Sequence, residues 1–306
     1  MGTTRWDPDD WKDYSAKTTA KPADAIFTSR SLHEDLDPKK ITIRESRDSD
    51  ANPNSTPIIV ASDVTGSMGM IADYFVKTGL GKFFEEVLER KPVSDPHLMV
   101  MGVGDFNYDR APLQVSQFEA DLKIADQLEK VYVEGGGGNN DSESYDMAVY
   151  FAAYHTSTDC FEKRGKKGYL FTIGDEMPPT STSKVLIEKF TADKVQSEAG
   201  FKDTIAAAEK MYNYYHIIVA EGSYARGRLD KVKKAWSDLI GQNAVVLNDY
   251  HSLSELMVSL IEINEGRDKD DVVGSWSGAT AVTIASAVKD LATKDATAST
   301  GVVLFD

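Results

Sequence analysis

The segment IIVASDVTGSMG, residues 58–69, joins an unbroken apolar run to a turn that contains a carboxylate, two hydroxyl groups and two glycines. A short apolar run bounded by turn residues is typical of a strand that is buried on both faces of a sheet. A strand that ends in Asp63, Thr65 and Ser67 would bring several oxygen atoms to one edge of that sheet. The rest of the chain decides what kind of sheet is predicted.

The residues after Pro57 alternate short apolar runs with longer stretches in which apolar residues recur every three or four positions. This alternation predicts strands joined by helices, and therefore a largely parallel sheet with helices on both faces. The predicted strands lie near 58–62, 98–103, 113–117, 169–173, 215–220 and 244–247. The link between the second and third strands is too short for a crossover helix, so this pair should be antiparallel. The sequence thus predicts a doubly wound, mostly parallel α/β fold with six strands.

The length of 306 residues, 41% of them hydrophobic, allows one large α/β domain with extensions or two smaller domains. Residues 1–56 are polar and predict an N-terminal arm or extension, in which Trp6 and Trp11 indicate packing on the domain. The compact domain is predicted to span 57–264. Residues 265–306, rich in small side chains, predict a C-terminal extension with one helix around Ala279–Leu291.

The composition argues against several classes of partner. A net charge of −15 disfavours nucleic acids and membrane surfaces, because both attract basic side chains. Cys160 is the only cysteine, which excludes an internal disulfide and a cysteine-based zinc site. The amino terminus lacks the apolar core of a signal peptide, and no run approaches the ~20 apolar residues that span a bilayer. We therefore expect a soluble, cytoplasmic protein.

Three polar loops follow predicted strands or helices and are expected to meet at one edge of the sheet, because ligands bind beyond the carboxyl ends of doubly wound strands. They are Asp63–Ser67, Gly135–Asp141 and Gly174–Glu176. Asp63, Thr65 and Ser67 stand at alternate positions of a turn, and their hard oxygens suit Mg²⁺, or otherwise Mn²⁺ or Ca²⁺. If the Thr65 and Ser67 hydroxyls contact the ion, Asp63 and Asp175 would hold it mainly through bound water.

This pattern, D-x-T-x-S after the first strand and an aspartate after a later one, resembles the metal-ion-dependent adhesion site of von Willebrand factor A domains. The resemblance covers residues 57–264, and Asp63, Thr65, Ser67 and Asp175 match that site's first and third motifs. The second motif usually supplies a threonine after a glycine-rich turn. Here the turn reads GGGGNND, so that Asn140 or Asp141 would take its place.

The resemblance implies a Rossmann-like fold and a metal ion that captures an acidic residue from a partner protein. The chain looks like the intracellular bacterial or phage members of the family. Members of that kind suggest an AAA-type ATPase or another assembly protein as the partner. The family also implies a binding module. We expect no enzyme activity, because Thr65 stands where a phosphatase needs its general acid and the histidines and the cysteine form no catalytic arrangement.

Three other interpretations compete with a metal-dependent binding site. The hydroxyl groups of Thr65 and Ser67 could cap a following helix, and Asn140–Glu143 fits a helix capping box. The chain could be a phosphatase of the haloacid dehalogenase type with Asp63 as nucleophile. That enzyme needs an acid at position 65 and a late aspartate where Pro179 stands. Finally, an assembly protein could bind the metal solely for stability.

Two more features of the sequence bear on the site. Asp105 and Asp109 lie near the end of a predicted strand and could line the rim of the metal site, although loop aspartates are more often solvated. The five histidines are dispersed and form no metal-binding or triad motif.

Overall fold

The computed structural model describes residues 29–66, 78–133 and 142–292, together with residues 4, 5, 7, 13, 14, 16, 68, 71 and 74. The strands are β1 (Arg44–Ser46), β2 (Thr56–Asp63), β3 (Pro96–Val103), β4 (Leu113–Val115), β5 (Thr156–Thr158), β6 (Gly168–Gly174), β7 (Ser181–Thr182), β8 (Ala199–Gly200), β9 (Tyr212–Val219) and β10 (Ala244–Leu247). The α-helices are α4 (Leu80–Arg90), α5 (Lys123–Leu128), α6 (Tyr145–Tyr154), α7 (Asp159–Glu162), α8 (Lys184–Phe190), α9 (Phe201–Ala208), α10 (Leu229–Ile240), α11 (Leu253–Asn264), α12 (Lys269–Gly274) and α13 (Gly278–Val288). Short 3₁₀-helices are η1 (Glu34–Leu36), η2 (Pro38–Lys40), η4 (Ala225–Gly227), η5 (Gly241–Asn243) and η6 (Tyr250–Ser252).

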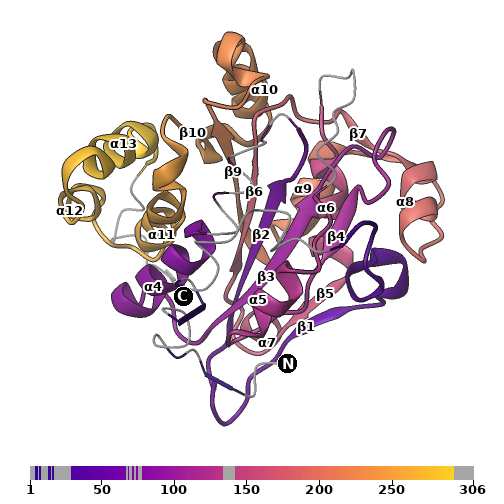
Figure 1. Ribbon diagram of the computed structural model, residues 1–306, viewed down its shortest axis with the longest axis horizontal. Helices are drawn as coiled ribbons and strands as arrows, with labels where there is room; N and C mark the ends of the chain where they lie inside the picture. Colours follow the sequence, from indigo (N-terminus) through magenta and orange to yellow (C-terminus); the bar gives the residue numbers. More distant parts are fainter. Residues whose placement is uncertain are drawn as a thin grey trace, which may run out of the picture.

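A six-stranded sheet forms the centre of the molecule, with the strand order β10–β9–β6–β2–β3–β4 (Figure 1). All neighbouring pairs are parallel except β3 and β4, which are antiparallel, as the short link between them predicted. The chain runs from β2 outward to β3 and β4 and then returns to the other side of β2 with β6. The strand order therefore reverses at β2, which is where doubly wound sheets bind their ligands.

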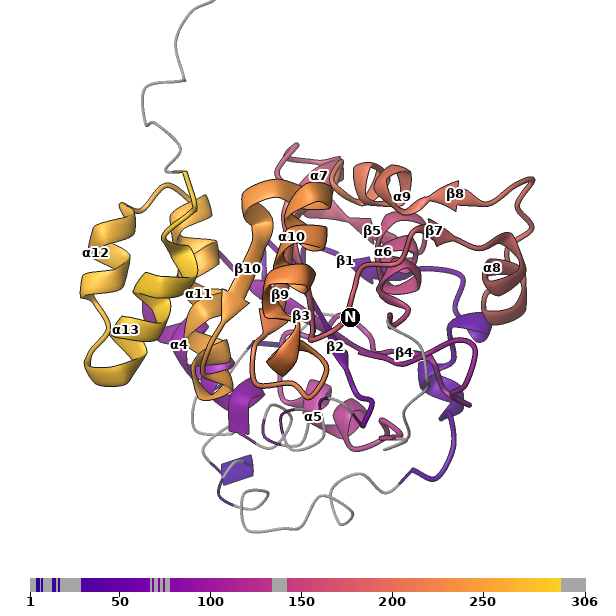
Figure 2. The ribbon, with the colours of Figure 1, turned by 90° about the horizontal axis from the view of Figure 1, so that it is seen from above.

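Alternate side chains of the strands pack into two apolar cores, one on each face of the sheet. Helices α4, α5 and α11 cover one face, whereas α6, α9 and α10 cover the other (Figure 2). On β2, Ile58 and Val60 belong to the first core, while Ile59 and Ala61 belong to the second. Because β2 is buried along its whole length, its sequence is continuously apolar. The predicted doubly wound α/β fold is confirmed.

The predicted strands and the observed ones differ mainly at their ends. β9 begins at Tyr212, three residues before the predicted start, and β4 ends at Val115, two residues before the predicted end. Two small sheets, parallel β1–β5 and antiparallel β7–β8, were not predicted. Their strands have only two or three residues, which is too short for an alternating apolar pattern to be recognised.

The described segments that precede and follow residues 57–264 in the chain both pack against the central domain. Arg44 of β1 donates its backbone N–H to the carbonyl of His155 at 2.7 Å, which starts the pairing with β5. Arg164 reaches Asp48 at 2.6 Å. At the other end of the chain, α12 and α13 pack against α11 (Figure 1). No helix in the described part of the chain combines the length and the apolar character needed to cross a membrane.

Candidate metal centre

Asp63 is the last residue of β2, and its side chain is completely buried. Its Oδ1 atom accepts hydrogen bonds from the Thr65 backbone N–H at 2.7 Å and from the Thr65 hydroxyl at 2.6 Å. These bonds fold the turn back onto the strand end and hold a hydroxyl oxygen beside the carboxylate. Burial raises the pKa of Asp63 to about 7; the charge of Asp175 acts in the same direction, whereas the Thr65 hydrogen bonds lower it. Among the described residues, no lysine or arginine forms an ion pair with Asp63.

Asp175 lies at the same edge because β6 ends beside β2. The two strands pair in parallel with Ser62 opposite Ile173, so that the next residues, Asp63 and Gly174, are also neighbours. Asp175 follows immediately and is completely buried. The sequence prediction that Asp63, Thr65 and Asp175 come together at the carboxyl ends of the strands therefore agrees with their positions.

The carboxylate of Asp175 is held by the loop that follows β9. Its Oδ2 atom accepts hydrogen bonds from the backbone N–H groups of Tyr224 at 2.8 Å and Ala225 at 3.4 Å. A Cβ atom on Gly222 would lie 2.3 Å from the same Oδ2 atom. Glycine at this position lets the loop backbone approach the carboxylate closely enough to bind it.

Tyr145, the first residue of α6, lies directly beneath the site. Its hydroxyl is 3.5 Å from the Oδ2 atom of Asp63, which is a long and weak hydrogen bond. A Cβ atom on Gly174 would lie 1.8 Å from the same hydroxyl oxygen, so only glycine at the end of β6 leaves room for this ring. Burial and the surrounding carboxylates raise the pKa of Tyr145 well above its ordinary value, so the group remains a neutral donor.

An aromatic stack supports the tyrosine from the side of α10. The ring of His216 packs edge-on against Tyr145, with 5.1 Å between ring centroids, and stacks on Trp236 at 3.5 Å. The indole N–H of Trp236 donates to the backbone carbonyl of Glu176 at 2.9 Å. Trp236 of α10 therefore contacts both the loop after β6 and the His216 ring of β9.

Two further carboxylates, Asp105 and Glu143, are buried around the site. The Oδ2 atom of Asp105 and the Oε2 atom of Glu143 are buried and make no hydrogen bond. The backbone N–H of Phe106 donates to the Ser144 hydroxyl at 3.0 Å, which joins the two segments. Burial raises the pKa of Glu143 to about 10, and the charge of Asp63 also raises it. Asp105 is only 1% exposed, so the expectation that it is solvated is wrong.

The other sequence-predicted ligands are Ser67, Asn140 and Asp141, and all three lie outside the described residues. The capping-box interpretation can be tested and is wrong for α6. That helix begins at Tyr145 with Ser144 in the N-cap position, so Asn140 is not its cap. Glu143 accepts a hydrogen bond from the Tyr145 N–H through its backbone carbonyl, while its side chain is buried near the carboxylates.

The donor atoms at this edge fit a hard divalent cation. Asp63 and Asp175 supply carboxylate oxygens and Thr65 supplies a hydroxyl, which are the ligand types that Mg²⁺ prefers. Within the described part of the chain, no three His, Cys, Asp or Glu side chains lie close enough together to hold a metal ion by themselves. A cation at Asp63 and Asp175 would therefore complete its coordination with hydroxyl groups and water.

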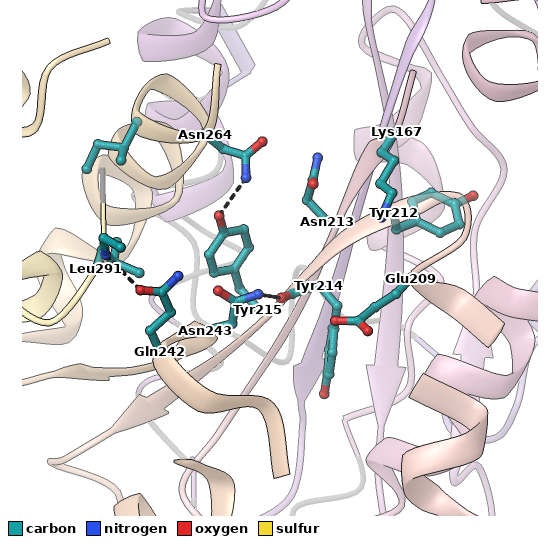
Figure 3. A pocket seen from close by; sticks show the side chains of 12 residues that line it. Lys167, Glu209, Tyr212, Asn213, Tyr214, Tyr215, Gln242, Asn243, Asn264 and Leu291 are labelled. Atoms are coloured by element: carbon teal, nitrogen blue, oxygen red, sulfur yellow. Dashed lines mark hydrogen bonds between the residues drawn. The ribbon is translucent and has the colours of Figure 1, made fainter. Parts of the chain in front are cut away.

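The amino ends of the strands enclose a cavity of a different kind, with a volume of about 250 Å³. Figure 3 shows the carboxamide side chains that line it, which belong to Asn213, Gln242, Asn243 and Asn264. Asn264 donates to the Tyr215 hydroxyl at 3.0 Å, and Asn243 donates to the Tyr214 carbonyl at 2.9 Å. Neutral groups that bind one another and the backbone therefore dominate this end of the sheet.

Comparison with known protein families and with curated protein sequences finds no match. Solved structures give distant likenesses. The pilus adhesin SpaC from Lactobacillus rhamnosus GG is 9% identical, with a TM-score of 0.46 over 72% of this chain and 32% of that chain. A von Willebrand factor type A protein from Catenulispora acidiphila is 12% identical, with a TM-score of 0.37 over 70% and 44%. This chain thus spans less than half the length of either protein. The fold assignment rests on the strand order and not on these likenesses.

Proposed function

We propose that this chain is a protein-binding module that depends on a divalent metal ion, Mg²⁺ or otherwise Mn²⁺ or Ca²⁺. Asp63, Thr65, Ser67 and Asp175 would hold the ion, with Asn140 or Asp141 as a further ligand. One observation carries the proposal: two completely buried aspartates lie at the carboxyl ends of neighbouring strands, where the strand order reverses. Burying like charges together is costly, and a cation between them offsets that cost.

The mode of binding that we propose is capture of an aspartate or glutamate from a partner protein. A metal ion held partly by neutral hydroxyl groups keeps much of its positive charge, so a carboxylate can replace one of its water molecules. The net charge of −15 would repel an acidic partner, so the local field of the ion has to overcome that repulsion. An AAA-type ATPase or another assembly protein remains our proposed partner, on the basis of the family resemblance.

Metal binding can be measured on protein that has been stripped of metal. Mg²⁺ should raise the melting temperature, because a ligand bound only by the folded state stabilises it. Asp63→Asn should remove this response. Asp203→Asn on α9 is the matched control, since Asp203 is exposed on a different element. Identical melting curves with Mg²⁺ and with chelator would contradict the proposal.

Acid capture requires a separate test. Peptide pairs that differ only in Glu or Gln should be compared for binding to the immobilised protein, with Mg²⁺ or with chelator. The Glu peptides should bind better, only with Mg²⁺, and not to Thr65→Ala. If the metal raises the melting temperature but no Glu peptide is preferred, the ion has a purely stabilising role.

We also propose that the chain is not a phosphatase. Thr65 stands where the general acid of that reaction would be needed, and its backbone N–H and its hydroxyl both donate to the carboxylate of Asp63. The purified protein should hydrolyse a generic aryl phosphate no faster than Asp63→Asn does. Turnover that Asp63→Asn abolishes would favour the phosphatase instead.

A further inference from the structure

A second polar cavity lies along the edge of the sheet and shares no lining residue with the metal centre. It has a volume of about 470 Å³ and lies between residues 34–44 and residues 117–130. The 3₁₀-helices η1 and η2 cover strand β4 here, which Figures 1 and 2 both show. The cavity is therefore walled on one side by the segment before β2 and on the other by the region of α5.

Arg44 forms one wall and is only 7% exposed. Its Nη2 atom donates to the carbonyls of Asp35 at 2.7 Å and Val115 at 3.1 Å. Its Nε atom is buried without a hydrogen bond, and its Nη1 atom has no partner among the described residues. No described carboxylate lies within 4.0 Å of the guanidinium, and burial lowers the pKa of Arg44 to about 10. The charges of Asp35 and Glu119 act on Arg44 without contacting it. A buried cation that contacts no anion is unusual in proteins.

Glu119 forms the facing wall and is also only 7% exposed. Its Oε1 atom accepts a hydrogen bond from the Gln127 side chain at 2.8 Å, whereas its other oxygen has no partner among the described residues. Its backbone exchanges two hydrogen bonds with Leu98 of β3, which fixes its position at the sheet edge. The cavity thus holds one buried positive group and one buried negative group that do not pair with each other.

The lysines at the rim are already neutralised. Lys40 pairs with Glu34 at 3.1 Å, and Lys130 pairs with Asp35 at 2.7 Å. Lys123 pairs with an aspartate just outside the cavity at 3.3 Å. Asp126 also lines the cavity, but it is exposed to solvent. The buried charges left to bind a ligand are therefore those of Arg44 and Glu119. A ligand that satisfies both must carry an anion and a cation.

We propose that this cavity binds a small zwitterion, a free α-amino acid, with its carboxylate on Arg44 and its ammonium group on Glu119. An α-amino acid presents both charges close together, and the cavity has the size of ordinary small-molecule sites. Charge-assisted hydrogen bonds at both ends would compensate the two buried groups. This inference does not depend on the metal centre.

Calorimetry with the full chain tests the proposal, using the standard L-amino acids one at a time as probes. At least one should bind at millimolar concentration. Its N-acetyl derivative, which lacks the ammonium group, and its amide, which lacks the carboxylate, should each bind about tenfold more weakly or worse. Absence of binding by every amino acid, or an N-acetyl derivative that binds as tightly as its parent, would overturn the proposal.

Two variants test which residue binds the ammonium group of the amino acid and which binds its carboxylate. Glu119→Gln keeps the acceptor for Gln127 and should weaken amino-acid binding about tenfold while leaving the N-acetyl derivative unaffected. Glu198→Gln is the matched control and should change nothing, because Glu198 is exposed, does not line the cavity and forms no ion pair among the described residues. Arg44→Gln should abolish binding; if it also unfolds the protein, Glu119→Gln and the two derivatives decide the question. Equal affinity of wild type and Glu119→Gln would contradict the proposal.

Discussion

The two ends of the central sheet differ in the polar groups that they bury. At the carboxyl ends of the strands, Asp63 and Asp175 are buried together, and the Glu143 carboxyl lies near them with an unsatisfied oxygen. At the amino ends, the carboxamide of Asn243 donates to a backbone carbonyl and that of Asn264 donates to a tyrosine hydroxyl. The same strands therefore carry an excess of buried negative charge at one end and neutral groups at the other.

This difference supports the proposal that a ligand binds at the carboxyl ends of the strands. Hydrogen bonds between neutral groups stabilise a fold without help, whereas adjacent buried carboxylates destabilise it unless a cation binds. The carboxyl end thus has a cost that a bound ion would remove. Among the described residues, the amino end has no such pair of adjacent buried carboxylates, although it encloses a cavity of about 250 Å³. Variants at matched positions of the two ends can test this interpretation.

The largest expected effect comes from the glycines at the two ends of β6. A Cβ atom on Gly174 would lie 1.8 Å from the Tyr145 hydroxyl, and one on Gly168 would lie 2.5 Å from the Pro57 carbonyl oxygen. Both contacts are too close, so Gly174→Ala and Gly168→Ala should each destabilise the protein by about 2–4 kcal/mol in urea unfolding.

Only the first substitution should also affect the metal response. Gly174→Ala displaces Tyr145 from beneath Asp63, so the rise in melting temperature with Mg²⁺ should shrink. Gly168→Ala lies at the far end of the strand and should leave that rise unchanged. If both variants lose the metal response equally, the two ends are not independent.

Most of the fold could be predicted because long apolar runs and helical stripes are local properties of the sequence. The run from Ile58 to Ser62 identified β2, and the short link before β4 identified the antiparallel pair. The two small sheets could not be predicted, because β1 and β5 have three residues each and pair across more than a hundred positions. Nothing local in either strand indicates its partner.

The candidate site was predictable only in part, for a related reason. Asp63, Thr65 and Asp175 stand in turns that directly follow predicted strands, which gave their positions. Tyr145 opens an apolar helix and resembles an ordinary core residue, so its contact with Asp63 needed the packing of α6. Glu143 had a local explanation as part of a capping box, and that explanation concealed its burial.

The second prediction concerns how much the buried charge of Asp63 lowers the free energy of unfolding. Burial raises the pKa of Asp63 to about 7, so the folded protein disfavours the ionised form that the unfolded chain adopts readily. For such a group, stability is lost as the pH rises from about 4 through 7. In metal-free protein at pH 8, Asp63→Asn should therefore increase the free energy of unfolding by about 1–3 kcal/mol.

Urea unfolding at two pH values checks this prediction. The gain from Asp63→Asn should be present at pH 8 and nearly absent near pH 4, where the carboxyl is protonated in the folded state and about half protonated in the unfolded chain. The exposed control Asp203→Asn should change stability by less than about 0.5 kcal/mol at either pH. If metal-free Asp63→Asn is less stable than metal-free wild type at pH 8, the buried carboxylate of Asp63 does not destabilise the fold.

A smaller effect is expected from His97, at the amino end of β3. Its Nδ1 atom is 3.1 Å from the Ser46 hydroxyl, its Nε2 atom is buried without a hydrogen bond, and burial lowers its pKa to about 4. The unfolded chain binds a proton near pH 6.5, so stability should fall by up to about 2 kcal/mol between pH 6.5 and 4. His97→Gln should flatten this decline, whereas the exposed control His251→Gln should not. An unchanged slope in His97→Gln would assign the decline to other groups.

The smallest expected effect tests the link between Tyr145 and the metal centre. The hydroxyl lies 3.5 Å from Asp63 Oδ2, which is too long for a strong hydrogen bond, while the ring stays packed against His216. Tyr145→Phe should therefore cost less than about 1 kcal/mol and weaken Mg²⁺ binding only about two- to fivefold. The hydroxyl oxygen is also the atom nearest to a Cβ on Gly174. Tyr145→Phe should consequently recover about 1 kcal/mol in the Gly174→Ala background, measured by a double-mutant cycle in urea. Strictly additive losses would mean that Gly174→Ala acts through the backbone of β6 and not through the tyrosine.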